Sequence, residues 1–79
     1  MREITIKLNT VKKVQDFVQQ IQHVSSTVMI TNGISELDAK SVMSVYSFNL
    51  LQSLTCRVYG DNEQEEEDVI SFIKEWSVA

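Results

Sequence analysis

The sequence predicts an α+β open-faced sandwich, in which helices cover one face of a four-stranded antiparallel sheet in the order β-α-β-β-α-β-α. Three observations predict it. Two segments alternate apolar and polar residues with the period of a strand, two others carry apolar residues at helical spacing, and an Asn-Gly pair separates two short β-rich runs. Each helix needs an apolar partner, and only the sheet is large enough to provide one. The length of 79 residues predicts one domain.

The first strand is expected over residues 2–8, where Ile4, Ile6 and Leu8 alternate with polar residues. Thr10 is placed to cap the helix that follows. The apolar residues of this helix recur at helical spacing and are expected to form its buried stripe: Val14, Phe17, Val18 and Ile21, with Val24 as a further candidate.

The middle of the chain predicts a hairpin and a short helix. Residues 28–31 are β-rich, and the Asn-Gly pair behind them is a common two-residue hairpin turn, so residues 34–39 are expected to pair with them. Ser41 can then cap a helix that runs to about Ser47, before the chain returns to the sheet.

The last third predicts a strand and a helix. Leu54, Cys56 and Val58 alternate with polar residues up to Gly60. An acidic run over residues 63–68 then begins the last helix, since the helix dipole stabilises carboxylates in a first turn by ~0.3–1 kcal/mol each. An acidic face for a partner is the alternative interpretation of this run. The buried stripe of the helix is expected to contain Val69, Phe72, Ile73 and Trp76.

The composition argues against several classes of function. A net charge of −4 disfavours nucleic-acid binding, which depends on lysine and arginine neutralising phosphates. No window approaches the roughly 20 apolar residues that cross a bilayer, and the N-terminus does not resemble a secretory signal, so a cytoplasmic protein is expected. Cys56 has no partner spacing and is expected to be a buried apolar side chain. We expect no cofactor, no metal and no enzymatic activity, because no serine or cysteine has a histidine placed to activate it.

Several short motifs are similar to those of a known family. They are Phe17-Val18-Gln19 in the first helix, Asn32-Gly33 at the turn, Lys40-Ser41 before the short helix, and Gly60 before the acidic helix. Together with the order of elements, they resemble HPr, the phosphocarrier of the bacterial sugar phosphotransferase system. The resemblance covers most of the chain and implies a single HPr-like domain over residues 1–79. It also implies protein partners of the phosphotransferase type, or a transcription factor of carbon regulation.

The sequence departs from the family in the loop after the first strand. HPr proteins carry there a Gly-x-His-Ala-Arg-Pro-like motif, whose histidine caps the first helix and takes a phosphoryl group. The corresponding stretch, Asn9 to Val14, is shorter and has no histidine, arginine or proline. A phosphate on Thr10 would be a stable ester, and a protonated lysine is a poor nucleophile. We therefore expect the histidine carrier chemistry to be lost.

Two further features lie in or near this first helix. Thr10, Lys12 and Lys13 are a candidate anion site, because free N–H groups and the helix dipole attract negative charge; a solvated first turn is the alternative. His23 is the only histidine, and it lies near the other end of the helix. It is expected to be a surface residue rather than a replacement for the missing acceptor.

The resemblance implies a regulatory site at Ser41, since the matching serine is phosphorylated by a dedicated kinase in HPr proteins of many Gram-positive bacteria. A purely structural N-cap is the alternative interpretation. Ser44 stands where the family usually has glycine, which adds bulk at the docking surface. The apolar residues expected to dock onto partners, if exposed, are Val42, Met43, Tyr46 and Phe48.

These observations predict a regulatory or docking protein that is not a histidine phosphocarrier. The alternatives are a phosphocarrier that uses an unrecognised acceptor residue, and a structural or ligand-binding α+β module with the same fold alone. Met29 and Tyr59 are expected on the sheet face opposite the helices, where they lie in water or against a second copy. The oligomeric state is therefore expected to be a monomer or a weak dimer.

Overall fold

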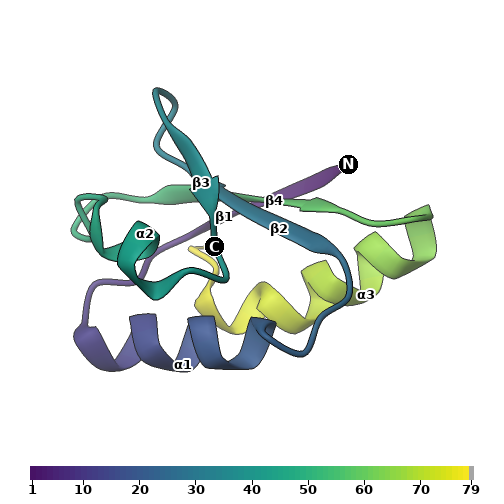
Figure 1. The fold of residues 1–79 in the computed structure, drawn as a ribbon, viewed down its shortest axis with the longest axis horizontal. Coiled ribbons are helices and arrows are strands. Elements are labelled where there is room, and N and C mark those ends of the chain that lie inside the picture. Colours follow the sequence, from purple (N-terminus) through teal and green to yellow (C-terminus); the bar gives the residue numbers. More distant parts are fainter. Residues whose placement is uncertain (79) are drawn as a thin grey trace.

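The computed structural model describes residues 1–78, which form one four-stranded antiparallel sheet with helices packed on one of its faces (Figure 1). This confirms the predicted fold class. In chain order the elements are β1 (Arg2–Ile6), α1 (Val11–Ile21), β2 (Thr27–Thr31), β3 (Glu36–Asp38), α2 (Val42–Tyr46), β4 (Leu54–Tyr59), α3 (Glu63–Ile73) and the single 3-10 turn Lys74–Trp76. The strand order across the sheet is β1-β4-β2-β3.

The inner strand β4 shows the predicted alternation. Its residues Leu54, Cys56 and Val58 are buried against the helices, and Cys56 lies opposite Ile4 of β1 and Ile30 of β2. Burial also raises the pKa of the Cys56 thiol to about 12, so this cysteine is a neutral apolar side chain at physiological pH.

The first strand is shorter than the expected residues 2–8. It ends at Ile6, because the chain leaves β4 there and instead contacts the C-terminal segment: Ile6 bridges Ser77, and the Lys7 N–H donates to the Trp76 carbonyl over 3.1 Å. Leu8 is nevertheless fully buried, as its place in the alternating pattern predicts.

The core joins the two longer helices to the sheet. Phe17 of α1 meets Trp76 edge to face, with ring centroids 5.3 Å apart. Complete burial of side chains of this size contributes roughly 1.5–3 kcal/mol each. The predicted stripe of α1 is confirmed, since its four members are all buried: Val14, Phe17, Val18 and Ile21.

The predicted stripe of α3 needs one correction. Val69, Ile73 and Trp76 are buried as expected, but Phe72 is 39% exposed. One helical step from Ile73 turns the Phe72 side chain away from the sheet by about 100°. Its ring still meets the Trp76 ring in a T-shaped arrangement, with centroids 6.3 Å apart.

The acidic run has a structural role at the start of α3. Asn62 caps the helix, and Glu63, Glu65 and Glu66 lie in its first turn, as the dipole argument predicts. Glu66 is buried and accepts from the Gly60 N–H over 3.0 Å and from the Met1 ammonium group over 3.1 Å. These interactions lower the pKa of the Glu66 carboxyl.

Glu65 ties the same turn to the start of β2. Its carboxylate accepts from the hydroxyls of Ser25 and Ser26 over 2.9 and 2.8 Å, and from the Asp61 N–H. These hydrogen bonds lower the pKa of Glu65. The acidic residues of this turn therefore hold three segments of the chain together.

The hairpin between β2 and β3 forms where predicted, but its turn is longer. Thr31 pairs with Glu36, so the loop contains residues 32–35 instead of two residues. The Asn32 side chain accepts from the N–H groups of Ile34 and Ser35, each over 2.9 Å, and Gly33 takes a positive φ of 95°. This side-chain turn replaces the expected two-residue backbone turn.

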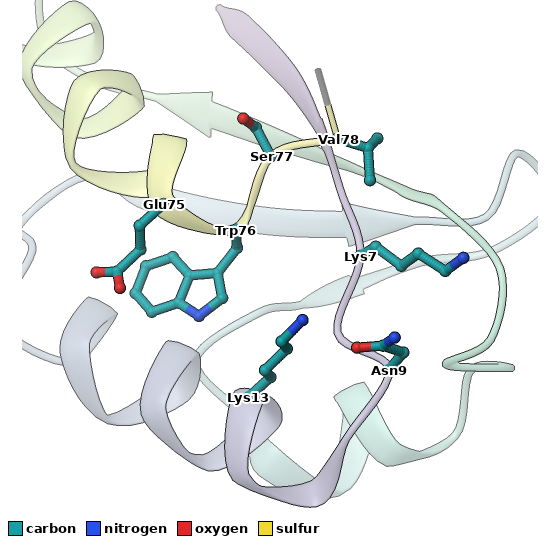
Figure 2. A pocket seen from close by; sticks show the side chains of 7 residues that line it. All are labelled: Lys7, Asn9, Lys13, Glu75, Trp76, Ser77 and Val78. Carbon is teal, nitrogen blue, oxygen red and sulfur yellow. The ribbon is translucent and has the colours of Figure 1, made fainter.

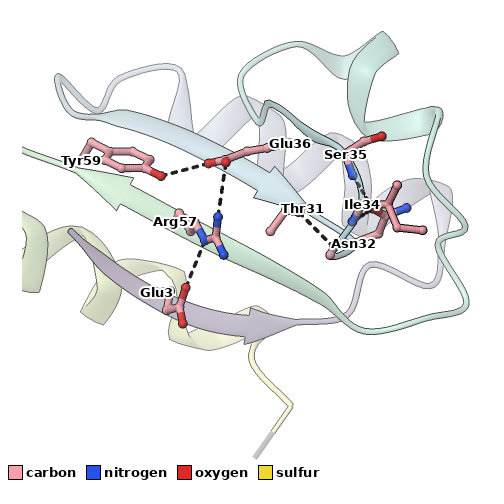
Figure 3. A network of polar contacts seen from close by, with 9 residues as sticks. Glu3, Thr31, Asn32, Ile34, Ser35, Glu36, Arg57 and Tyr59 are labelled. Carbon is pink, nitrogen blue, oxygen red and sulfur yellow. Dashed lines mark hydrogen bonds and ion pairs between the residues drawn. The ribbon is translucent and has the colours of Figure 1, made fainter.

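The open face of the sheet carries a polar network that crosses it (Figure 3). Arg57 of β4 bonds Glu3 of β1 over 3.1 Å and Glu36 of β3 over 3.3 Å, and Tyr59 donates to Glu36 over 3.0 Å. Met29 lies on this face opposite Arg57 and is half-buried. The prediction that Met29 and Tyr59 lie on the sheet face opposite the helices agrees with their places in β2 and β4.

A Glu66→Gln substitution should lower the free energy of unfolding at pH 7 and weaken its dependence on pH. Because the folded pKa of Glu66 lies below its ordinary value of 4.5, the carboxylate contributes stability above that value, which is lost as the pH falls through the folded pKa. Denaturant unfolding at pH 7 and at about pH 3 measures both effects. Glu67→Gln, which changes an exposed carboxylate one residue along, is the control. Equal losses in the two variants would contradict this role of Glu66.

Candidate functional site

The start of α2 is a surface turn built around Ser41. Ser41 is the N-cap residue, with an extended backbone, and its hydroxyl accepts from the Ser44 N–H over 3.4 Å. Upstream, the Asp38 carboxylate accepts from the Lys40 N–H over 2.9 Å and thereby forms the turn between β3 and the helix. The predicted cap is therefore confirmed, and the Ser41 side chain lies half-exposed at the beginning of the helix.

This turn is held against the end of α1. The Lys40 ammonium group donates to the Val24 carbonyl, and the Gln22 side chain donates to the Lys40 carbonyl. Because both bonds join main chain to side chain across two elements, they fix the position of Ser41 relative to α1.

The short helix α2 presents apolar side chains to solvent. Met43 is 76% exposed, while Val42 and Tyr46 are each about one-third exposed and lie one helical turn apart. We call these three residues the α2 surface. Only Val45 of this helix is buried, because five residues give it one face toward the core. Leu51, in the loop after α2, is 74% exposed; the sequence analysis did not single it out.

Phe48 does not belong to this surface. Its place directly after the short helix predicted an exposed docking residue, but the structure buries it in the core with 7% exposure. The chain turns back toward β4 directly after α2, and this turn points the Phe48 ring inward. The docking candidates are therefore Val42, Met43 and Tyr46.

The three residues of the candidate anion site have separate roles. Thr10 caps α1, and its hydroxyl accepts from the Lys13 N–H over 3.1 Å. Lys12 forms an ion pair with Asp16 over 3.1 Å, one turn along the exposed face. The side chain of Lys13 turns instead toward the C-terminal segment. The structure thus does not bring the Lys12 and Lys13 ammonium groups together around Thr10 as one site.

Lys13 lines a pocket that sequence spacing did not indicate (Figure 2). The pocket has a volume of about 150 Å³ and lies between the end of β1, the start of α1 and the C-terminal segment. Its position depends on the pairing of Lys7 with Trp76, residues that lie at opposite ends of the sequence. The residues that line it are Lys7, Asn9, Lys13, Glu75, Trp76, Ser77 and Val78.

Three other kinds of site bear on function within residues 1–78: a second phosphate acceptor at His23, a metal site and a membrane-spanning helix. His23 is exposed and lies just beyond the end of α1, far along the helix from Thr10. Among residues 1–78, no group of three His, Cys, Asp or Glu side chains is arranged to hold a metal ion. No helix within these residues combines the length and the apolar character needed to cross a membrane.

Comparisons with known proteins agree with the geometry. The sequence model of the family described as "PTS HPr component phosphorylation site" matches residues 3–75. The fold is similar to the crystal structure of HPr-C-His from Thermoanaerobacter tengcongensis, with a TM-score of 0.73 and 24% identity, over 95% of this chain and 92% of that one. No curated protein sequence matches the chain.

Replacing Ser41 with alanine should lower the free energy of unfolding by about 0.5–1 kcal/mol, because the first turn of α2 loses its side-chain cap. Ser41→Asp should retain most of the stability, since aspartate is a comparable N-cap. Denaturant titration measures both variants, with Ser53→Ala, an exposed serine in the loop before β4, as the control. An unchanged midpoint for Ser41→Ala would show that the cap does not stabilise the fold.

Proposed function

The chain belongs to the HPr family of the sugar phosphotransferase system, and from this premise we propose that it acts as a docking or regulatory protein and not as a histidine phosphocarrier. The observation that carries the proposal is the residue that caps α1. In the HPr family this residue is the phosphorylated histidine; here it is Thr10, whose hydroxyl accepts a hydrogen bond from the Lys13 N–H.

The chemistry of threonine supports this interpretation. A phosphocarrier must accept a phosphoryl group and pass it on readily, which an imidazole nitrogen does. A threonine phosphate is a stable ester, so even a modified Thr10 would not serve as a donor. The lone histidine of the chain, His23, lies more than two helical turns away along α1.

The α2 surface supports a role in protein binding. Val42, Met43 and Tyr46 expose apolar area on a short helix whose position is fixed by the Lys40 contacts to α1. Exposed apolar residues on a rigid element are a common docking surface in small proteins. The expected partners are phosphotransferase proteins or a transcription factor of carbon regulation.

Ser41 is the proposed site of regulation. Its hydroxyl is half-exposed at the edge of the α2 surface, next to Val42. A phosphate there would add about two negative charges beside apolar docking residues and would alter partner choice. Ser44 is half-buried where the family usually has glycine, and its side chain adds bulk beside the same surface.

Intact-mass measurement after two separate phosphorylation reactions tests the function. One reaction offers phosphoenolpyruvate and the upstream phosphotransferase enzyme; the other offers ATP and the HPr serine kinase. We expect one phosphate in the kinase reaction only, and none for Ser41→Ala. A phosphate transferred from phosphoenolpyruvate would contradict the proposal and support a carrier with an unrecognised acceptor. If neither reaction adds a phosphate, the regulatory role of Ser41 is contradicted and only the docking role of the α2 surface stands.

A substitution on the α2 surface tests docking directly. Met43→Ala should weaken binding to the upstream phosphotransferase enzyme by about fivefold or more, because it removes an exposed apolar side chain from the centre of the surface. Calorimetric titration measures the affinity. Ile34→Ala is the matched control, since Ile34 is 93% exposed but lies at the tip of the β2–β3 hairpin. Equal effects of the two substitutions would place docking elsewhere.

A further inference from the structure

The pocket beside Trp76 combines positive charge with an apolar wall. Lys7 follows β1 and Lys13 belongs to α1, so two lysines from different parts of the chain line the pocket, and in Figure 2 the Lys13 ammonium group points toward Trp76 while that of Lys7 points away from it. No carboxylate of residues 1–78 lies within ion-pair distance of either lysine, whereas the neighbouring Lys12 has its partner in Asp16. In a chain of net charge −4, this gathers two lysines that form no ion pair with any other residue of 1–78.

The remaining lining adds hydrogen-bonding and apolar groups. The Asn9 side chain lies below Lys7 and to the right of Lys13 in Figure 2, and the indole of Trp76 and the side chain of Val78 supply apolar surface. Trp76 is buried and held by Phe17, so this wall is rigid. A ligand that fits must therefore carry a negative group for the lysines and a small carbon skeleton for the wall.

We propose that this pocket binds a small organic oxyanion, either a carboxylate or a phosphate ester with a few carbon atoms. The oxyanion contacts Lys13 and the Asn9 amide, with Lys7 supplying further positive charge, and the carbon skeleton lies against Trp76 and Val78. The volume of about 150 Å³ suits a small metabolite. This site lies apart from the α2 surface and does not depend on the docking function.

The carboxylate of Glu75 places a negative charge in the lining of the same pocket. Glu75 also lines the pocket, and in Figure 2 it lies on the opposite side of the Trp76 ring from Lys7. A negative charge there opposes anion binding. Removing it should therefore tighten binding, which is a gain that general damage to the fold would not produce.

Fluorescence of Trp76, the only tryptophan in the chain, gives a local probe in the native protein. Butyrate and methyl phosphate, titrated at constant ionic strength, should each change its emission with saturation at a Kd of about 1–10 mM, as expected for ligands of this size. The tighter of the two identifies the oxyanion group. n-Butylammonium, which has the same carbon chain as butyrate and the opposite charge, should not bind.

Three substitutions complete the test. Lys13→Gln should weaken binding by about threefold to fivefold, Glu75→Gln should tighten it, and Lys12→Gln, outside the pocket, should leave it unchanged within about twofold. The absence of saturation with both anions, equal binding of n-butylammonium, or equal losses for Lys12→Gln and Lys13→Gln would overturn the proposal. Amide chemical shifts should move at Lys7, Asn9 and Ser77 on anion addition; movement confined to other residues would also overturn it.

Discussion

The packing of two helices over the central strand is the constraint on which the rest of the structure depends. Phe17 of α1 and Trp76 after α3 meet edge to face, above the buried residues of β4. This contact holds α1 beside the C-terminal segment. The hydrogen bond from the Lys7 N–H to the Trp76 carbonyl joins the end of β1 to the same segment. The helix α2 lies outside this contact and buries only Val45, so its other apolar side chains face solvent.

The same packing separates two surfaces with different chemistry. The α2 surface is apolar and is held in place by Lys40, which bonds the end of α1. The pocket at the start of α1 is lined by two lysines, and Thr10 beside it caps the helix. The fold is that of the HPr family, and the proposed docking role rests on the absence of a histidine from the start of α1.

Local patterns predicted most of the fold because they depend on near neighbours in the chain. The alternation around Cys56 and the stripe of α1 need only the side-chain periods of strands and helices, and the caps at Thr10 and Ser41 need only the next three residues. The resemblance to HPr added the connection between these elements, and the family match agrees with it.

Features that depend on contacts between distant segments could not be predicted in the same way. The hairpin loop is four residues long because the Asn32 side chain, and not the backbone alone, forms the turn. Phe48 is buried through the path of the loop that follows α2. The pocket requires Lys7 and Trp76 to be neighbours, which no spacing in the sequence indicates. The most direct test of the account is phosphoryl transfer from phosphoenolpyruvate to a sugar-specific phosphotransferase component, reconstituted with a histidine-containing HPr and increasing amounts of this chain. The account predicts that the chain slows transfer by occupying the docking sites and does not become labelled. Transfer supported by this chain in the absence of the histidine-containing HPr would contradict it.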